Sequence, residues 1–303
     1  MRGCPALRLS EDSFVTDTHP DVSATISRIF VYPVKSCAGV ELRESLLIET
    51  GLEFDRAWMV VDEHGQGVTQ RELPRMALIK PQMRYSDVVL RAPGMLALHL
   101  AMDGVEAPVK VKVWGETVAA YDMGDLAAQW FSDFLGAKLR LARFDPAHKR
   151  VSSAQWTGPV EALNQFSDAF ALLVTSEASL APLNERLAAA GHPPVDMERF
   201  RPNIVLDGIP AHEEDRLDQM HIATAEGEIV LKPVKPCVRC PIPDVDPATA
   251  VVGHGVRDAL QAYRGNPLMD GAPTFGMNAI VLQGVEQMLR VGQVVRADYR
   301  FED

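Results

Sequence analysis

The chain has 303 residues, of which 47% are hydrophobic and 23% charged. This composition is that of a globular protein with enough residues to bury one large core or two modest ones. Its formal net charge of −11 argues against a general binder of nucleic acids or membrane surfaces, because such proteins need positive potential. Four cysteines are too few for a disulfide framework, so we expect a reducing, cytoplasmic location.

The chain begins with a segment that has no strand or helix pattern. Residues 1–23 contain no apolar run of signal-peptide length and are predicted to be a loose leader without a targeting role. From residue 24 to 145, short β-branched and aromatic runs alternate with turns rich in Gly, Pro and Asp. That spacing is typical of short strands.

We expect three helices, at residues 124–136, 176–191 and 255–264. In the first, Leu126, Trp130 and Phe134 recur every four residues and predict a face directed into the core. Asp125 is placed to cap this helix and Gly136 to end it.

Two parts of the chain are separated by residues 145–167, where the strand pattern is lost and a long connection is predicted. Short strands return after the second helix, as in 221–234 and 289–299. We therefore predict an α+β, predominantly β protein in two barrel-like parts, residues 24–145 and 146–303.

The stretch 232–247, "KPVKPCVRCPIPDVDP", carries Cys237 and Cys240 in a CxxC spacing. A thioredoxin-like redox pair would need a helix N-terminus at the first cysteine, but Pro241 and the prolines after it disfavour a helix there. A structural zinc site would need four ligands, and the nearest candidates are the single residues His221 and His254.

A third interpretation is that one thiolate binds a soft transition metal or acts as a nucleophile. Lys232, Lys235 and Arg239 would favour the thiolate over the thiol and would suit an anionic ligand. The plain alternative is that Cys237 is a small buried hydrophobic residue and the basic residues form a solvated turn.

Other polar residues stand next to predicted strands. Lys35 and Ser36 follow the strand in "VYPVKSCAGV", Arg56 precedes the strand in "EFDRAWMVV", and Arg201 and Asn203 precede the strand in "ERFRPNIVL". With the cysteine loop, they predict an extended site for an anion with polar, amide-type donors.

Five separated motifs resemble one protein family in their order along the chain. They are "VYPVKSCAGV", "DRAWMVVDEHG", "SEASLAPLN", "RFRPNIVLDG" and "KPCVRCPIPDVDPATA". The chain resembles the MOSC superfamily with its N-terminal β-barrel partner domain, similar to the mitochondrial amidoxime-reducing component and to bacterial hydroxylaminopurine-resistance reductases. The resemblance runs from about residue 24 to 300 and implies a MOSC N-terminal β-barrel domain over 24–145 and a MOSC domain over 146–303.

The resemblance also implies a molybdenum cofactor, in which a pterin dithiolene holds a molybdenum oxo centre. Cys240 matches the cysteine that ligates the metal, which suits the preference of such a metal for sulfur, while Cys237 would be structural. The backbone around Val238 and Arg239 matches the segment that holds the pterin's polar edge. Asp168 matches an acidic position facing the metal, where it could relay protons, although a turn or N-cap role is the alternative.

The remaining matched positions concern the two ends of the cofactor. Lys35, Ser36 and Arg56 match residues that grip its terminal phosphate, and Arg201 and Asn203 match residues that lie along the pterin. These roles are implied by the resemblance.

The resemblance implies a molybdenum-dependent oxidoreductase that reduces hydroxylamines, amidoximes and other N-hydroxylated compounds. No cysteine follows Cys240, so the chain lacks the iron–sulfur segment of some relatives and electrons are expected from a separate donor protein, such as a ferredoxin-like protein, a flavoprotein or a cytochrome. The alternative is a cofactor carrier or sulfur-transfer module without turnover of its own, because the superfamily includes part of the molybdenum cofactor sulfurases.

Overall fold

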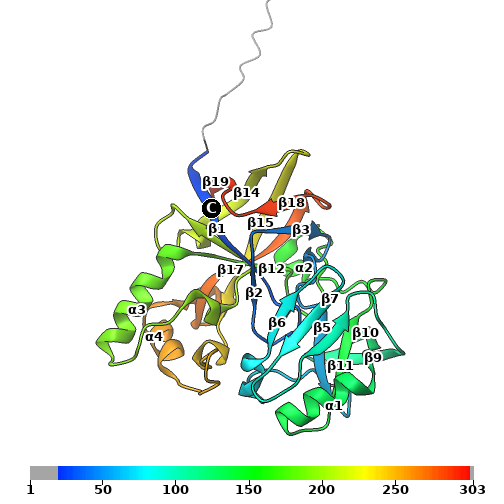
Figure 1. The fold of residues 1–303 in the computed structure, drawn as a ribbon. Helices are drawn as coiled ribbons and strands as arrows, with labels where there is room; N and C mark the ends of the chain where they lie inside the picture. Colours follow the sequence, from blue (N-terminus) through cyan, green and yellow to red (C-terminus); the bar gives the residue numbers. More distant parts are fainter. Residues whose placement is uncertain (1–19, 301–303) are drawn as a thin grey trace, which may run out of the picture.

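The protein is described here by a computed structural model that places residues 20–300 (Figure 1). Most of the predicted leader therefore lies outside the described residues. Within them the chain forms nineteen strands and four α-helices, with six short 3-10 helices. The predicted class, α+β and predominantly β, is confirmed.

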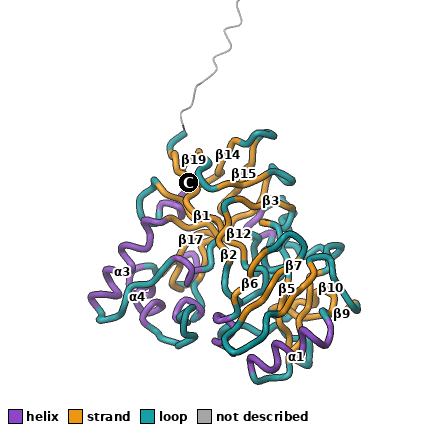
Figure 2. Tube along the Cα trace, in the orientation of Figure 1, coloured by secondary structure: helices purple, strands orange, loops and turns teal. Residues whose placement is uncertain are grey.

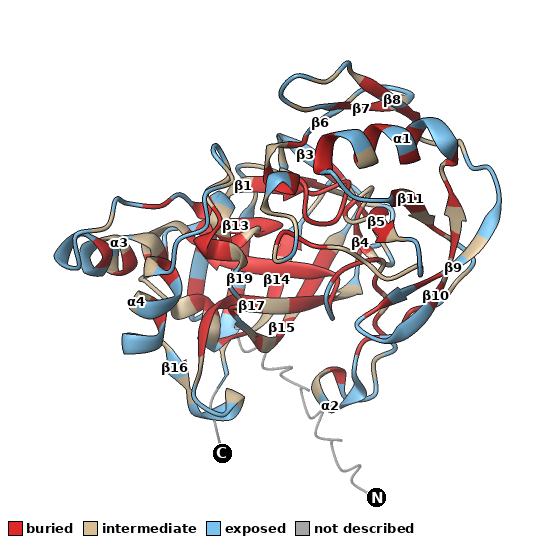
Figure 3. Ribbon diagram, turned by 90° about the horizontal axis from the view of Figure 1, so that it is seen from below, coloured by how far each residue is buried: buried red, intermediate tan, exposed pale blue. Residues whose placement is uncertain are grey.

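Seven strands close into a barrel. In spatial order they are β12 (Leu172–Ser176), β13 (Ile204–Asp207), β1 (Val22–Val31), β19 (Val294–Tyr299), β14 (Leu217–Ala223), β15 (Glu228–Val238) and β17 (Ala272–Gln283). The pairing of β17 with β12 closes the ring, and only the β12–β13 pair is parallel. Alternate side chains point inward along each strand, so Ile26, Leu206 and Leu231 lie fully buried in one core. Figure 3 shows much of the barrel coloured as buried.

The first strand of the described chain belongs to this barrel. β1 pairs with β13 on one side and β19 on the other, both of which come from the second half of the sequence. The loop at 32–39 then carries Val34 and Cys37 into the core of the N-terminal half before the chain returns along β1. The loop that carries Lys35 and Ser36 therefore lies at the junction between the two halves.

The N-terminal half is built from two smaller sheets and one helix. The larger sheet has the order β5 (Trp58–Asp62), β11 (Leu139–Phe144), β10 (Glu116–Asp122) and β9 (Pro108–Val113). The smaller has the order β6 (Lys80–Met83), β7 (Asp87–Arg91) and β8 (Leu98–Ala101). Trp58, Val88 and Phe131 are fully buried in a core that these sheets share with helix α1 (Gly124–Leu135).

The three predicted helices are present as α1, α3 (Leu180–Ala189) and α4 (Gly255–Tyr263), at the periphery of the molecule (Figure 2). In α1, Trp130 and Phe134 are buried as expected and Gly136 ends the helix in the left-handed conformation. The prediction for Leu126 was wrong, because its side chain is 76% exposed. Because a helical turn contains 3.6 residues, positions four apart shift around the helix axis, and Leu126 falls beyond the edge of the buried face.

The predicted cap of α1 was also wrong. Asp122 Oδ1 accepts the Gly124 N–H at 2.7 Å, whereas Asp125 is directed toward Arg140. The carboxylate three residues earlier in the sequence is therefore the one that satisfies a free N–H of the first turn.

The remaining elements complete the two halves. They are β2 (Val40–Leu42), β3 (Glu44–Ile48), β4 (Gly51–Leu52), β16 (Gly265–Asn266), β18 (Met288–Arg290), α2 (Ala154–Thr157), η1 (Pro74–Leu78), η2 (Glu177–Ser179), η3 (Met197–Phe200), η4 (Glu213–Arg216), η5 (Ile242–Asp244) and η6 (Pro267–Met269). None of the helices within residues 20–300 is both long and apolar enough to cross a bilayer.

Candidate functional site

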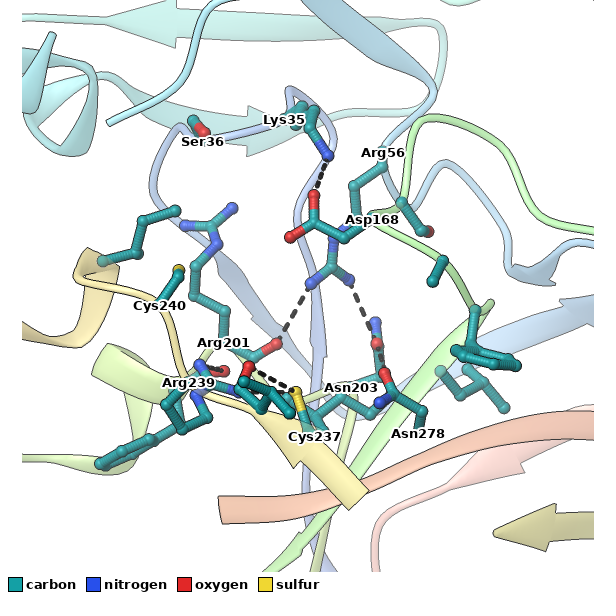
Figure 4. Close-up of a pocket in the computed structure, with 18 of the residues that line it drawn as sticks. Lys35, Ser36, Arg56, Asp168, Arg201, Asn203, Cys237, Arg239, Cys240 and Asn278 are labelled. Carbon is teal, nitrogen blue, oxygen red and sulfur yellow. Dashed lines mark hydrogen bonds and ion pairs between the residues drawn. The ribbon is translucent and has the colours of Figure 1, made fainter. Parts of the chain in front are cut away.

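A cavity lies where the two halves meet, lined by loops that leave strands of both (Figure 4). Cys237 lines it, and so do the nine predicted ligand-site residues: Lys35, Ser36, Arg56, Asp168, Arg201, Asn203, Val238, Arg239 and Cys240. They come from the loop after β1, the segments before β5 and β12, the turn between η3 and β13, and the end of β15. Their proximity is shown by the structure, whereas their individual roles stay predictions.

Lys35 and Asp168 form an ion pair in this cavity, with 2.5 Å between Lys35 Nζ and Asp168 Oδ1. Lys35 also donates to the Phe166 carbonyl at 2.7 Å and is almost completely buried. Burial lowers the pKa of Lys35, and the nearby carboxylate only partly offsets this. The Asp168 side chain is more than half exposed, and the charges of Lys35 and Arg71 hold its pKa below its usual range.

Two predicted roles therefore meet in one contact. A lysine that grips a terminal phosphate and an acid that faces the metal are expected at different ends of a cofactor, yet the two side chains touch. Lys35 Nζ uses two of its three N–H donors on Phe166 and Asp168, so one donor remains for a phosphate. Because Asp168 is ionised, as a relay it must accept a proton before passing one on.

Arg56 is the centre of a buried polar network. It pairs with Asp55, donates to Asn203 Oδ1 at 3.1 Å and donates to the Arg201 carbonyl at 3.1 Å. Asp55 in turn accepts the Tyr32 N–H at 2.8 Å and is 2% exposed. Arg56 and Asn203 thus fix the loops that form the cavity wall, in addition to any contact that they make with a ligand.

Arg201 lies over the same tyrosine as Arg56. The two guanidinium carbons are 4.2 Å and 4.4 Å from the Tyr32 ring centroid, a distance at which cations attract an aromatic face. Arg201 donates to the Cys37 carbonyl at 2.6 Å, while its second terminal nitrogen is buried without a partner among the described residues. Burial, and then the charge of Arg56, lower the pKa of Arg201 to about 10, so it stays protonated at neutral pH.

The backbone around the cavity is strained. Ser36, Arg56 and Arg201 have φ values of 67°, 51° and 57°, in the left-handed region that residues with a side chain seldom adopt. Backbone strain of this kind is kept where the surrounding structure enforces it, often at ligand sites.

Cys237 and Cys240 are both free thiols at the end of β15. Arg239 donates to Cys237 Sγ at 3.0 Å and to the Phe200 carbonyl at 2.9 Å, so Cys237 has a protein partner. Within residues 20–300 no hydrogen bond involves the Cys240 thiol, although it lines the cavity. Of the two cysteines, Cys240 is the one available to a ligand.

The alternatives for the CxxC motif are disfavoured by its surroundings. Cys237 lies in a strand rather than at a helix N-terminus, so the dipole that activates a redox pair is missing. Among the residues that the structure describes, no three His, Cys, Asp or Glu side chains come together as metal ligands. His221 pairs with Glu228 and His254 packs against His192.

The donor set of the cavity suits an anionic group that contains a soft metal. Lys35, Arg56, Arg201 and Arg239 line it against the single carboxylate of Asp168. Arg239 Nε is, like the free nitrogen of Arg201, buried without a partner among the described residues. Buried cations with unsatisfied donors favour an anion, and a free thiol favours a soft metal. The backbone N–H of Arg239 already donates to the Pro273 carbonyl, so this N–H would reach a ligand only by breaking that bond.

Several residues of the site were not predicted. Arg71 lies 3.9 Å from Asp168, Trp114 donates to Asp168 at 3.2 Å, and Thr69 and Asn278 line the cavity. Trp114 had one sequence signal, a large aromatic residue before glycine in a tight turn, where a small polar residue is usual.

The comparisons with known proteins agree with this architecture. The chain matches the family models described as "MOSC N-terminal beta barrel domain" over residues 23–138 and "MOSC domain" over residues 162–296. It therefore belongs to the family of proteins that combine these two domains.

Similar curated proteins connect this family with molybdenum. The chain is 34% identical to mitochondrial amidoxime reducing component 2 of Rattus norvegicus, over 92% of this chain and 84% of that protein. It is 35% identical to mitochondrial amidoxime-reducing component 1 of Mus musculus, over 79% and 71%. It is 29% identical to the molybdenum cofactor sulfurase of Bos taurus, over 80% of this chain and 29% of that protein. The function of the chain is therefore related to the molybdenum cofactor.

Proposed function

We propose that the protein is a molybdenum-cofactor-dependent oxidoreductase that reduces N-hydroxylated compounds with electrons from a separate donor protein. The observation that carries this proposal is the cavity of four cations, two of them buried and two half-buried, beside the free Cys240 thiol. The names of the amidoxime-reducing relatives support the choice of substrate class.

In the proposed reaction an N-hydroxylated compound, R–NH–OH, takes up two electrons and two protons and gives R–NH₂ and water. When bound, the cofactor supplies the two-electron chemistry that removes the oxygen atom. Cys240 would hold the metal through its thiolate. Lys35, Ser36 and Arg56 would hold the phosphate end, and Arg201 the pterin.

The protein's other contribution is proton handling. Asp168 is 59% exposed at its side chain and ionised, so it can accept a proton from solvent at the cavity. Lys35, which touches it and has a lowered pKa, is a donor at short range. Together they would supply protons to the departing oxygen.

A carrier or sulfur-transfer module is the second candidate function, favoured by the match to part of a molybdenum cofactor sulfurase. Such a module would hold the same cofactor without turnover. The cavity chemistry serves both functions, so only turnover separates them.

The test is an anaerobic assay on protein purified from a host that makes the cofactor. Reduced methyl viologen serves as the electron donor and benzamidoxime as the substrate, with benzamidine measured as the product. We expect turnover in the wild type, none in Cys240→Ala, and none with NADH alone, because the sequence has no nicotinamide fingerprint of the GxGxxG type. Fully metallated protein that is inactive with every donor and substrate would favour the carrier.

The location in the cell also needs a test. We infer a cytoplasmic protein from the low cysteine content, whereas the names of several relatives include "mitochondrial". Fractionation of the native host, followed by detection of the full chain, would decide between the two.

A further inference from the structure

The turn between β9 and β10 places a tryptophan at a position that does not suit it. Val113 pairs with Glu116, so Trp114 and Gly115 form a two-residue turn. Their φ values are 50° and 88°, which is the pattern of a type I′ turn, where Asn-Gly is preferred. A bulky residue is strained at such a φ, and Trp114 is 56% exposed, so packing into the core does not explain it.

Trp114 instead contacts three charged groups at the edge of the cavity. Its indole N–H donates to Asp168 Oδ1 at 3.2 Å. The Arg71 guanidinium is 4.6 Å from its ring centroid, and the Lys35 ammonium is 5.9 Å away. These residues come from separate segments, and Lys35 and Asp168 line the cavity itself.

The same carboxylate is thus held from three sides. Lys35 and Trp114 share Asp168 Oδ1, and Arg71 lies 3.9 Å from the other oxygen. The Asp168 side chain is more than half exposed, so without these partners it would be free to rotate. Arg71 Nη1 is buried without a partner within the described residues, so Arg71 depends on the indole and the carboxylate for its contacts.

We propose that Trp114 is a positioning residue of the cavity: the strained turn holds the indole where it keeps the Asp168 carboxylate against Lys35 and Arg71. The negative charge of the carboxylate is then paired with two cations, so it repels an anionic ligand of the cavity less than an unpaired carboxylate would. The inference rests on the proposed function only in taking the cofactor as that ligand.

The strained turn makes the proposal testable, because one substitution should have two opposite effects. Relief of the strain should stabilise the folded protein, whereas loss of the indole contact should weaken the binding of the ligand. In Trp114→Asn, the turn receives its preferred residue and the contact is lost. We expect the melting temperature of the cofactor-free protein to rise by about 2 °C. We expect molybdenum to be lost from the loaded protein about threefold to tenfold faster during dialysis, because a hydrogen bond to a charged group is removed.

Two further variants separate the effect of the indole contact with Asp168 from the effect of losing a large exposed side chain. Trp114→Phe keeps a ring over Arg71 but removes the N–H, and should give an intermediate rate of molybdenum loss. Tyr85→Asn is the matched control, because Tyr85 is a fully exposed aromatic residue of the same half that does not line the cavity. It should retain molybdenum as the wild type does.

A second measurement does not depend on the cofactor. Inorganic pyrophosphate is titrated into cofactor-free protein by calorimetry, and Trp114→Asn should bind it at least about threefold more weakly than the wild type. A wild type that takes up no molybdenum but binds pyrophosphate, with this weakening in the variant, would overturn the proposed function and leave the inference standing. A wild type that binds neither would overturn both. Unchanged ligand retention in Trp114→Asn, or a lower melting temperature, would overturn the inference, since the tryptophan would then be a plain turn residue or a structural one.

Discussion

Two of the places where the protein buries charge differ in how that charge is satisfied, and the comparison shows which of them favours a ligand. In the cavity, Arg56 and Arg201 lie over one tyrosine ring with Lys35 nearby. On another part of the barrel, Glu214 in η4 is completely buried and accepts hydrogen bonds from Ser179 Oγ at 2.9 and 3.1 Å.

The two regions respond to burial differently. Burial, and then the charge of Asp215, raise the pKa of Glu214 to about 7, so this carboxyl can avoid its charge by taking up a proton. Arg201 cannot lose its proton at neutral pH, because its pKa falls only to about 10. Positive charge therefore persists in the cavity and is best satisfied by an anion, whereas the glutamate needs no ligand.

The largest effect is expected from breaking the ion pair in the cavity wall. In Arg56→Ala, the buried Asp55 loses its cationic partner, so the cofactor-free protein should lose about 3–5 kcal/mol of unfolding free energy. Urea unfolding measures this. The double variant Asp55→Asn/Arg56→Gln should lose less, because no unpaired charge remains. A loss within about 1 kcal/mol for Arg56→Ala would show that the network has little structural role.

Glu214 gives the second largest effect, and its sign depends on pH. Its pKa in the folded protein is above the ordinary value of 4.5, so folded protein binds the proton more tightly and stability falls as pH rises from about 4.5 to 7. Glu214→Gln should therefore gain up to about 3 kcal/mol at pH 8 and almost nothing at pH 4.5. Urea unfolding at both pH values is the measurement, and an equal effect at both would contradict the titration of Glu214.

Lys35→Met should have the smallest effect on stability. Its partner Asp168 is more than half exposed, so water can replace the lysine and the cofactor-free protein should change by less than about 1 kcal/mol. The molybdenum content of loaded protein should nevertheless fall, because a cation of the cavity is lost. If Lys35→Met unfolds as easily as Arg56→Ala does, Lys35 belongs to the structural network instead.

Much of the site was accessible from the sequence because its residues lie in short motifs. Cys240, Arg201 and Lys35 each follow or precede a strand, and loops at strand ends of a barrel converge. The relative positions of these loops were not accessible, since they depend on β1 joining strands from the far half of the chain. For that reason the contact between Lys35 and Asp168 was not foreseen.

Arg71 and Trp114 were missed for a related physical reason. Each reaches the cavity from the N-terminal half, and their place there depends on the packing of that half against the barrel rather than on any local pattern. The error at Leu126 has a local cause instead. Residues spaced by four shift around the helix axis with each turn, so such a series stays on the buried face for only about two turns.

The central claim is that Cys240 and the cations of the cavity hold a molybdenum cofactor. Elemental analysis of protein from a cofactor-producing host tests it most directly, with Cys240→Ala and Cys237→Ala compared side by side. We predict about one molybdenum per chain in the wild type, a nearly complete loss in Cys240→Ala, and retention in Cys237→Ala, because only Cys240 has a free thiol at the cavity without a protein partner among the described residues. Equal loss in both variants, or zinc in place of molybdenum, would contradict the account.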